Sequence, residues 1–495
     1  MLEGARSRGP GVASCADAGR LRHGRSWTFL EEDLNMNELV ASCADGLSEF
    51  SHALHFDTIP REVRENIALR VLDTVGIALA STREDFAPSV LGLAETWGGG
   101  DCTVIGAKIR ASVPMAILAN GSLAHGLDYD DAHILSICKP SAVVVPTALA
   151  LGESMGLDGA TILTAMAAGY ETMTRLGMAA SGEFHARGWH ATAVCGTFAA
   201  TVVAGKCLAL SASELTAALG IAGSFASGVL ECLEDGSWVK RLHAGWAGHS
   251  GAVAAGLARR GFTGPATILE GRFGLYRTFL GSVPDSARIT GDLGSRWETL
   301  QVAFKPYPCC HYNHAYMDCA ARLRREHAVT PEAIDSVECL VPAPEVPIVC
   351  EPLAAKRRPR TAYDAQFSLP YAVAVALVED EVGIESFSPE RIQDERLLAL
   401  AARVRYTVTQ ASTFPKSFPG RLVIRMRDGR VLEAEEPFNR GSAENPLGRD
   451  DIVAKFRQNA GRVLAPSRVA ALEQGALRLA ATPDVRTFLT LCALA

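Results

Sequence analysis

The first half of the chain carries apolar residues at helical spacing. Val63, Ile67, Val71 and Val75 follow Pro60 at intervals of four, which predicts a helix with one buried face. Proline suits the first turn of such a helix. Further apolar stretches, joined by short turns that contain Gly or Ser, predict a succession of helices. They cover residues 113–126, 141–155, 158–180, 190–208, 213–231 and 243–260.

Alanine and glycine are frequent in these predicted helices, as in "ATAVCGTFAATVVAGKCLAL" and "AGHSGAVAAGLARRG". Small side chains let helix axes approach more closely than the usual distance of roughly 8–10 Å. We interpret them as positions of tight packing, some of which could lie between subunits.

The pattern changes beyond residue 285. The stretches "SVECLVPAPEVPIV" and "RLVIRMRDGRVLEAEE" are rich in Val and Ile with partial alternation, and Asp428-Gly429 between two such runs predicts a hairpin. Helices are predicted over 312–327 and 364–378, and again over 450–461 and 467–481. The fold class is therefore mainly α. We expect a helical domain over 39–284, a smaller α+β lid domain over 285–440, and C-terminal helices over 441–495 that return to the first domain.

Composition narrows the class of protein. Hydrophobic residues make up 48% and charged residues 21%, which is typical of a folded globular chain. The net charge of -7 and the lack of a long basic block give no sign of nucleic-acid binding. The apolar runs are shorter than the roughly 20 residues that cross a bilayer, so no membrane span is expected.

The cysteines and the N-terminal residues indicate the cellular compartment of the protein. Thirteen cysteines without a secretory signal or a Cys-x-x-Cys pair predict reduced thiols in a cytoplasmic protein. Residues 1–38 are rich in Arg, Gly and Ser without apolar periodicity, which predicts a disordered leader, with a transit peptide as the sharper alternative.

The segment "HGLDYDDAH", residues 125–133, places three carboxylates and two imidazoles within nine positions. A metal site, a solvated acidic loop and a proton-transfer site are three interpretations of it. Its spacing does not match a motif that fixes metal ligands on one helix face. The third interpretation requires cations and further imidazoles from elsewhere in the chain.

Three later segments supply such groups. "RGWHATAVCG" places His190 at a predicted helix start, and "GSWVKRLHAGWAGHSG" carries Lys240 and His243 three residues apart. "FKPYPCCHYNHAYMD" carries Lys305 with several further polar groups. Lysines beside carboxylates disfavour a divalent cation and favour an anionic substrate. Abstraction of a proton α to a carboxylate would use His190 or Asp128 as the base and the two lysines as cations for the developing charge.

Five segments in order resemble the MmgE/PrpD family, which includes 2-methylcitrate dehydratases, cis-aconitate decarboxylases and an iminodisuccinate epimerase. They are "HGLDYDDAH" followed by "KPSAVVVP", "GWHATAVCGT", "VKRLHAGWAGHSG", "FKPYPCCHYNHA" and "RRPRTAYDAQFSLPYAVA". The resemblance extends from Leu39 to the C-terminus. It implies a helical domain completed by the C-terminal segment, a lid domain, a homodimer and cofactor-free chemistry between the domains. It also implies that Asp128, His190, Lys240 and Lys305 line the active site.

Three positions depart from the family pattern. Many members carry His before the Pro-Ser pair where this chain has Lys139. The decarboxylases carry Thr at the position of Ala132 and His at the position of Cys310. Lys139 adds a cation, and the other two replacements argue against a simple decarboxylase assignment.

These observations predict a metal-independent lyase without a cofactor. It would act on a small di- or tricarboxylate, most simply as a dehydratase with His133 or Lys139 as the proton donor. An epimerase, a decarboxylase, a non-catalytic carboxylate-binding protein and a metal hydrolase are the alternatives. The predicted catalytic residues are Asp128, His190, Lys240, Lys305 and His133, and the predicted substrate-binding residues are Lys139, Asp131, His243, Tyr307, Cys310, His311 and Arg358.

Overall fold

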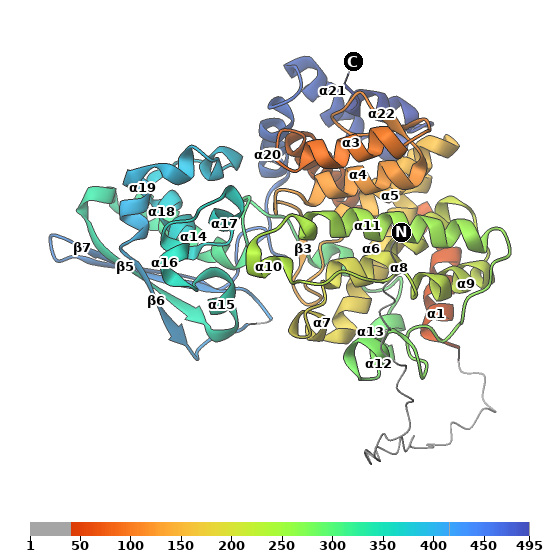
Figure 1. The fold of residues 1–495 in the computed structure, drawn as a ribbon, viewed down its shortest axis with the longest axis horizontal. Helices are drawn as coiled ribbons and strands as arrows, with labels where there is room; N and C mark the ends of the chain where they lie inside the picture. The colour runs from red at the N-terminus through yellow and green to blue at the C-terminus, as the bar shows by residue number, and fades with distance from the viewer. Residues whose placement is uncertain (1–40, 415, 495) are drawn as a thin grey trace, which may run out of the picture. The chain divides into compact units, whose positions relative to one another are not determined.

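The computed structural model of the chain describes residues 41–414 and 416–494, so the predicted leader over 1–38 lies outside the described residues. Helices dominate the described part up to residue 290 (Figure 1). They are α1 (Cys43–Ala53), α2 (Arg61–Ser81), α3 (Ala87–Trp97), α4 (Val113–His125), α5 (Ser141–Met155), α6 (Gly159–Ala180), α7 (Glu183–Ala186), α8 (Ala191–Cys207), α9 (Ala212–Ala222), α10 (Cys232–Asp235), α11 (Val239–Ala258), α12 (Leu275–Leu280) and α13 (Ser286–Thr290). Within the described residues no helix is long and apolar enough to span a bilayer.

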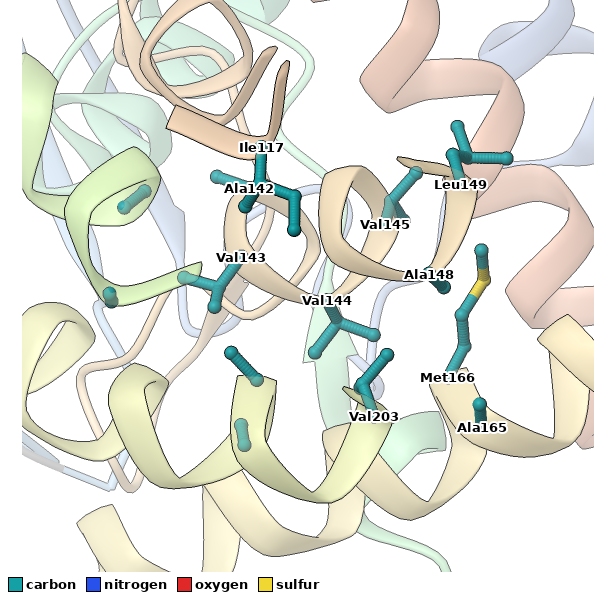
Figure 2. Packing of buried hydrophobic residues seen from close by; sticks show 14 of the residues in the cluster. Ile117, Ala142, Val143, Val144, Val145, Ala148, Leu149, Ala165, Met166 and Val203 are labelled. Atoms are coloured by element: carbon teal, nitrogen blue, oxygen red, sulfur yellow. The ribbon is translucent and has the colours of Figure 1, made fainter. Parts of the chain in front are cut away.

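The helix that was predicted after Pro60 is α2, and Pro60 is its N-cap residue. The predictions for α4, α5, α6 and α8 agree with the structure to within one residue at either end. Their buried faces form one hydrophobic core. Figure 2 shows α5 in this core, where Val144 faces Val203 of α8.

Two predicted helix boundaries in this part are wrong. The helix predicted over 213–231 ends at Ala222, and the chain then runs irregularly through Gly228, whose φ of 107° is incompatible with a right-handed helix. The helix predicted over 243–260 begins earlier, at Val239. Gly236 at φ 72° ends α10 and lets the chain enter α11 sooner, which places Lys240 in the first turn of that helix.

The small residues of α11 are positions of close helix contact, as predicted. A side chain on Gly245 would collide with the backbone carbonyl of Leu118 in α4. A side chain on Gly251 would meet the backbone at Thr201 of α8. These glycines therefore let α11 lie against both neighbours, and this packing holds Lys240 and His243 in place beside α4 and α8.

The second hydrophobic core is built around a four-stranded sheet with the order β6-β5-β7-β8. Strand β5 (Ile334–Pro342) pairs parallel with β6 (Val404–Thr409) and antiparallel with β7 (Gly420–Met426). The hairpin predicted at Asp428-Gly429 joins β7 to β8 (Val431–Glu436), and Gly429 takes a φ of 93° there. The helices of this part are α14 (His314–His327), α15 (Val346–Val349), α16 (Leu353–Arg357), α17 (Ala362–Gln366), α18 (Leu369–Val378) and α19 (Glu395–Ala401).

The structure corrects two predictions in this part. The helix predicted over 364–378 is divided into α17 and α18, because the Ser368 hydroxyl caps the amide of Tyr371 and Pro370 occupies the first turn of α18. The second half of "SVECLVPAPEVPIV" continues from β5 into helical turns, since its closely spaced prolines lack the amide donors that a sheet requires.

The C-terminal helices α20 (Arg449–Gly461), α21 (Pro466–Leu477) and α22 (Arg486–Cys492) pack on the first core. Their blue ribbons lie beside the orange helices in Figure 1. Phe456 of α20 lies against Gly76 of α2, and Lys455 forms a buried ion pair of 2.8 Å with Asp73. This return to the first core is the arrangement expected from the sequence.

The change from one core to the other occurs between Trp297 and Tyr307, later than the predicted boundary at residue 285. Helix α13 packs on α6, and strand β4 (Val302–Ala303) pairs with β3 (Ala132–His133). The remaining short strands, β1 (Cys102–Thr103) and β2 (Arg110–Ala111), pair with each other. The β3–β4 pair places Lys305 next to the segment that carries Asp128.

Candidate active site

A cavity of about 100 Å³ lies where the β3 segment, α11 and the start of the second core meet. It brings together eight of the residues that were predicted from sequence. They are Asp128, His133, Lys139, His190, Lys240, Lys305, Cys310 and His311. Apolar side chains form much of the remaining wall, namely Ile134, Ile137, Leu230, Leu233, Ile348, Phe367 and Phe418.

Asp128 lies between two lysines. Its Oδ1 accepts a hydrogen bond of 2.8 Å from Nζ of Lys240, and its Oδ2 accepts one of 2.8 Å from Nζ of Lys305. Burial by itself would raise the pKa of Asp128, but the two ammonium groups outweigh burial and hold that pKa well below its usual range. Asp128 has a φ of 49°, a left-handed conformation that aspartate tolerates better than most residues.

Lys305 is fully buried, and its ammonium group uses all three of its donors within the protein. Besides the Asp128 carboxylate, it donates to the backbone carbonyl of Asp128 at 2.7 Å and to that of Cys309 at 3.0 Å. Lys305 therefore fixes the position of Asp128 and has no donor left for a substrate.

Lys240 has a different environment, since its amine makes one hydrogen bond to the described residues and lies 5.2 Å from the centre of the Phe367 ring. Burial would lower the pKa of Lys240, but the charge of Asp128 outweighs burial and raises it. Two donors of a permanently charged ammonium group consequently remain for a ligand in the cavity.

Lys139 reaches the same cavity from the turn before α5. Its backbone N–H donates to Oγ1 of Thr192, but its amine has no hydrogen-bond or ion-pair partner within residues 41–414 and 416–494. Burial, followed by the charge of Lys305, lowers the pKa of Lys139 to about 8. The amine can therefore be present in both protonation states near neutral pH.

His190 belongs to a group of stacked and bonded imidazoles. Its Nδ1 lies 3.0 Å from Nδ1 of His243, and its ring stacks on that of His125, which is bonded to Asp130 at 2.6 Å. Burial, followed by the charge of His125, lowers the pKa of His190 well below its usual value. His190 is therefore a neutral imidazole, and no described residue hydrogen-bonds its Nε2.

His311 and Cys310 complete the polar part of the wall. The Asn439 amide donates to Nε2 of His311 at 2.6 Å, which assigns the ring proton to Nδ1, a buried atom without a partner in the described chain. Burial raises the pKa of the Cys310 thiol to about 11, so this group is protonated at neutral pH.

Four predicted substrate-binding residues are not part of the cavity wall. Asp131 is bound to Arg70 at 2.8 Å and to Ser141, so its carboxylate joins β3 to α2 and α5. His243 lies behind His190. The Tyr307 hydroxyl donates to Asp318 in a separate cavity of about 570 Å³.

Arg358 was also predicted to bind substrate, and the structure does not support this. Its side chain is 66% exposed and pairs with Glu395. His133 does line the cavity, but Ser136 and Glu298 engage both of its ring nitrogens. It is thus held as a structural partner of these two residues.

Sequence reasoning missed several residues of the wall. His185 on α7 lines the cavity, and its ring meets that of His190 edge-on at 5.9 Å. Its position five residues before His190 was the available signal. Leu230, Leu233 and Phe367 come from irregular or helix-breaking segments, where no periodicity indicates the direction of a side chain.

In the described part of the chain, no group of three or more His, Cys, Asp and Glu residues is arranged to hold a metal ion. All twelve cysteines described there are free and buried. The polar side chains of the cavity wall are those of three lysines, four histidines, one aspartate, one cysteine and one tyrosine.

Family models match the chain in two successive segments. The MmgE/PrpD N-terminal domain matches residues 45–286, and the MmgE/PrpD C-terminal domain matches residues 307–480. The chain belongs to the MmgE/PrpD family. The resemblance found in the five sequence segments is thereby confirmed.

Several curated relatives of this MmgE/PrpD chain match most of its length. The cis-aconitate decarboxylase-like protein oryM of Aspergillus oryzae is 26% identical over 456 residues, which are 88% of this chain and 93% of the relative. The cis-aconitate decarboxylase of Aspergillus terreus is 26% identical over 463 residues, which are 88% of this chain and 92% of that relative. The cis-aconitate decarboxylase of Mus musculus is 25% identical over 450 residues, which are 88% of this chain and 90% of that relative.

The three departures from the family pattern meet in one place. Ala132, Lys139 and Cys310 all line the cavity of this MmgE/PrpD chain.

Proposed function

We propose that the chain is a lyase for a small di- or tricarboxylate, and that it acts most simply as a dehydratase. One observation carries this proposal: a neutral imidazole, His190, shares a small cavity with two lysine amines that have unused donors, Lys139 and Lys240. Such a cavity can bind carboxylates and move a proton between carbon and oxygen.

His190 is the base in this proposal. Asp128 is a poor base because both of its oxygens are bound by ammonium groups and its pKa is depressed. His190 is neutral and has Nε2 unused by described residues, so it can accept the proton α to a substrate carboxylate. In this role Nδ1–H of His190 donates to Nδ1 of His243, which leaves Nε2 as the proton acceptor.

Lys240 binds the substrate carboxylate and stabilises the enolate-like charge, and Nδ1–H of His311 is a second donor for the substrate. Lys139 in its ammonium form protonates the departing hydroxyl, since both nitrogens of the other candidate donor, His133, are engaged. Lys305 positions Asp128, and Asp128 positions Lys240. Substitution of Lys240 by alanine should therefore abolish turnover, and an active variant would remove the role given to it.

Decarboxylation is the second candidate, because the relatives that match over most of the chain carry the name cis-aconitate decarboxylase. The replacements at Ala132, Lys139 and Cys310 weigh against the same substrate. For a substrate without an oxo group, loss of CO₂ replaces a bound charge with a neutral molecule, so a cavity with two available ammonium groups favours retention of that carboxylate.

The test is a screen of purified protein with methylcitrate, citrate, cis-aconitate and amino-dicarboxylates. Alkene absorbance, CO₂ release and exchange of substrate hydrogen with deuterated solvent are followed in parallel. Alkene formation supports dehydration, whereas CO₂ without prior exchange supports decarboxylation. Exchange without an alkene would instead indicate an epimerase, and thermal stabilisation without turnover would indicate a carboxylate-binding protein.

We also infer that the chain forms a homodimer through the outer face of α11. Trp238, Leu242 and Trp246 are spaced by four residues there and are 45%, 37% and 44% exposed. Such a stripe of large apolar side chains is typical of an interaction surface. A helix face can pack against its own copy across a two-fold axis, so a second copy is the proposed partner.

A further inference from the structure

Lys139 differs from every other lysine of the chain. All eight lysines lie in the described residues, and five of them have hydrogen-bonded amines: Lys206, Lys240, Lys305, Lys356 and Lys455. Lys108 and Lys416 are exposed. Lys139 alone combines a position in the wall of an interior cavity with an amine that no described residue binds.

The charges around the cavity explain why this amine has no partner. Three lysine amines share the site with the carboxylate of Asp128, and both oxygens of that carboxylate are bound by Lys240 and Lys305. The next carboxylate, that of Asp130, is bound to His125. Lys139 is therefore a cation that forms no ion pair with a described carboxylate, although the charges of Asp128 and Asp130 act on it from a greater distance.

The backbone of Lys139 is held in place, whereas its amine has no hydrogen-bond partner among the described residues. The backbone N–H of Lys139 donates to Thr192 at 3.1 Å, and Pro140 restricts the chain that follows. Ile134, Ile137 and Phe418 contribute apolar surface to the same cavity. A lysine in an apolar pocket beside other cations is the environment that activates an amine as a nucleophile.

We propose that Lys139 is a carbonyl-reactive amine that forms a Schiff base with a short 3-oxo acid and promotes loss of CO₂ from it. The lowered pKa of Lys139, about 8, supports this role because it makes the free amine available. The proposal goes beyond the lyase reaction above, since it requires neither proton abstraction by His190 nor a leaving hydroxyl.

The reaction balances with water and one solvent proton. The ammonium form of Lys139 and the ketone condense to a protonated imine and release one water molecule. The bond between the carboxylate carbon and the adjacent carbon then breaks, CO₂ leaves, and the electron pair forms an enamine as it neutralises the iminium nitrogen. The enamine carbon takes a proton from solvent. Water hydrolyses the new imine, which returns the ketone and the ammonium group.

The cavity selects a small oxo acid for two reasons. Its volume of about 100 Å³ is well below the roughly 300–1,000 Å³ of pockets for drug-sized ligands. The two unused donors of Lys240 provide a binding position for the carboxylate while the carbonyl carbon meets Lys139. A chain of four or so carbons with one carboxylate and a ketone is the expected class.

The test uses the full-length protein with acetoacetate and sodium borohydride, followed by peptide mass spectrometry. We expect a reduced adduct on Lys139, mainly the isopropyl group that remains after CO₂ loss. Adduct formation should need acetoacetate and should fail with 3-hydroxybutyrate, which has no ketone. The variant Lys139→Arg keeps the cation and should lose the adduct, whereas Lys206→Arg, at a lysine whose amine is bound by backbone carbonyls, should keep it.

A wild-type protein without an adduct on Lys139, or with no more there than on exposed Lys108 and Lys416, would overturn the proposal. Adducts that retain the carboxyl group throughout would overturn the decarboxylation step and leave the Schiff base. The trapping experiment does not depend on the dicarboxylate screen, because the wild-type adduct is read directly from the peptide. Failure of the lyase proposal and failure of the Schiff-base proposal are thus separate results.

Discussion

The ammonium group of Lys305 donates to both the side chain and the backbone of Asp128, at 2.8 and 2.7 Å. This double contact holds Asp128 in its left-handed conformation of φ 49°. Asp128 is consequently aligned to receive Lys240 on its other oxygen. Lys305 therefore positions Asp128 and also contributes to the free energy of unfolding.

Substitution of Lys305 by methionine should destabilise the protein by about 3–5 kcal/mol, because Oδ2 of the buried Asp128 carboxylate and two backbone carbonyls would lose their donor. Urea unfolding measures this change. Lys206→Met is the matched control, since its amine also makes three hydrogen bonds, all of them to backbone carbonyls outside the cavity. The control variant should lose stability but keep its turnover when folded. If the free energy of unfolding of Lys305→Met equalled that of the wild type, Lys305 would not be the residue that holds Asp128 in place.

Substitution of His190 by glutamine should lower the rate of substrate proton exchange by about 10²–10⁴. Glutamine keeps a polar side chain beside His243 but cannot accept the proton at neutral pH. Exchange of the α hydrogen with deuterated solvent is the measurement, with His185→Gln as a control at a neighbouring histidine of the same cavity. Equal losses in the two variants would indicate that His190 has no special role as base.

The pH dependence of turnover should report Lys139. Burial and neighbouring cations lower its pKa to about 8, so the ammonium form that donates a proton is present below that pH and lost above it. Turnover should accordingly fall as pH rises through about 8. Lys139→Arg should have much lower turnover, and the fall near pH 8 should be absent from what remains, because arginine stays protonated and does not give up its proton. A wild-type profile that is flat to pH 10 would remove the donor role from Lys139.

Dialysis against a chelator should leave turnover unchanged. The described residues contain no group of three or more His, Cys, Asp and Glu arranged for a metal ion, and ammonium groups take the positions that a divalent cation would occupy beside Asp128. Activity before and after treatment with EDTA, together with metal analysis of the protein, checks this prediction. Loss of turnover that zinc or magnesium restores would favour the metal-hydrolase alternative.

Site residues that lie on a helix or a pair of strands were predicted better than residues whose roles depend on long-range contacts. His190 at the start of α8 and Lys240 in the first turn of α11 both line the cavity, although the helix that carries Lys240 was predicted to begin only at residue 243. The mainly α fold was also predictable, because the apolar periodicity of each helix is a local pattern. The return of α20 to α2 was implied by the family resemblance, since periodicity predicts a helix but not the partner on which it packs.

The remaining errors come from long-range partners. Asp131 was assigned to substrate, but Arg70, 61 residues earlier, takes its carboxylate, and no spacing rule connects the two. Arg358 lies in the basic run with Lys356, yet Lys356 donates inward to backbone carbonyls whereas Arg358 is exposed. Which member of a cluster is satisfied internally depends on tertiary contacts, and composition does not reveal it.

The outer face of α11 provides the last prediction. Trp238, Leu242 and Trp246 form an exposed apolar stripe. Leu233, which lines the cavity near the same helix, is also exposed. The double variant Leu242→Glu with Trp246→Glu should convert a dimer to a monomer in size-exclusion chromatography with light scattering, because like charges would meet across a two-fold axis. Phe273→Glu, at a side chain that is 79% exposed elsewhere, should leave the dimer intact. A wild-type monomer at all concentrations, or a double variant that remains dimeric, would show that this stripe is not the interface between two copies.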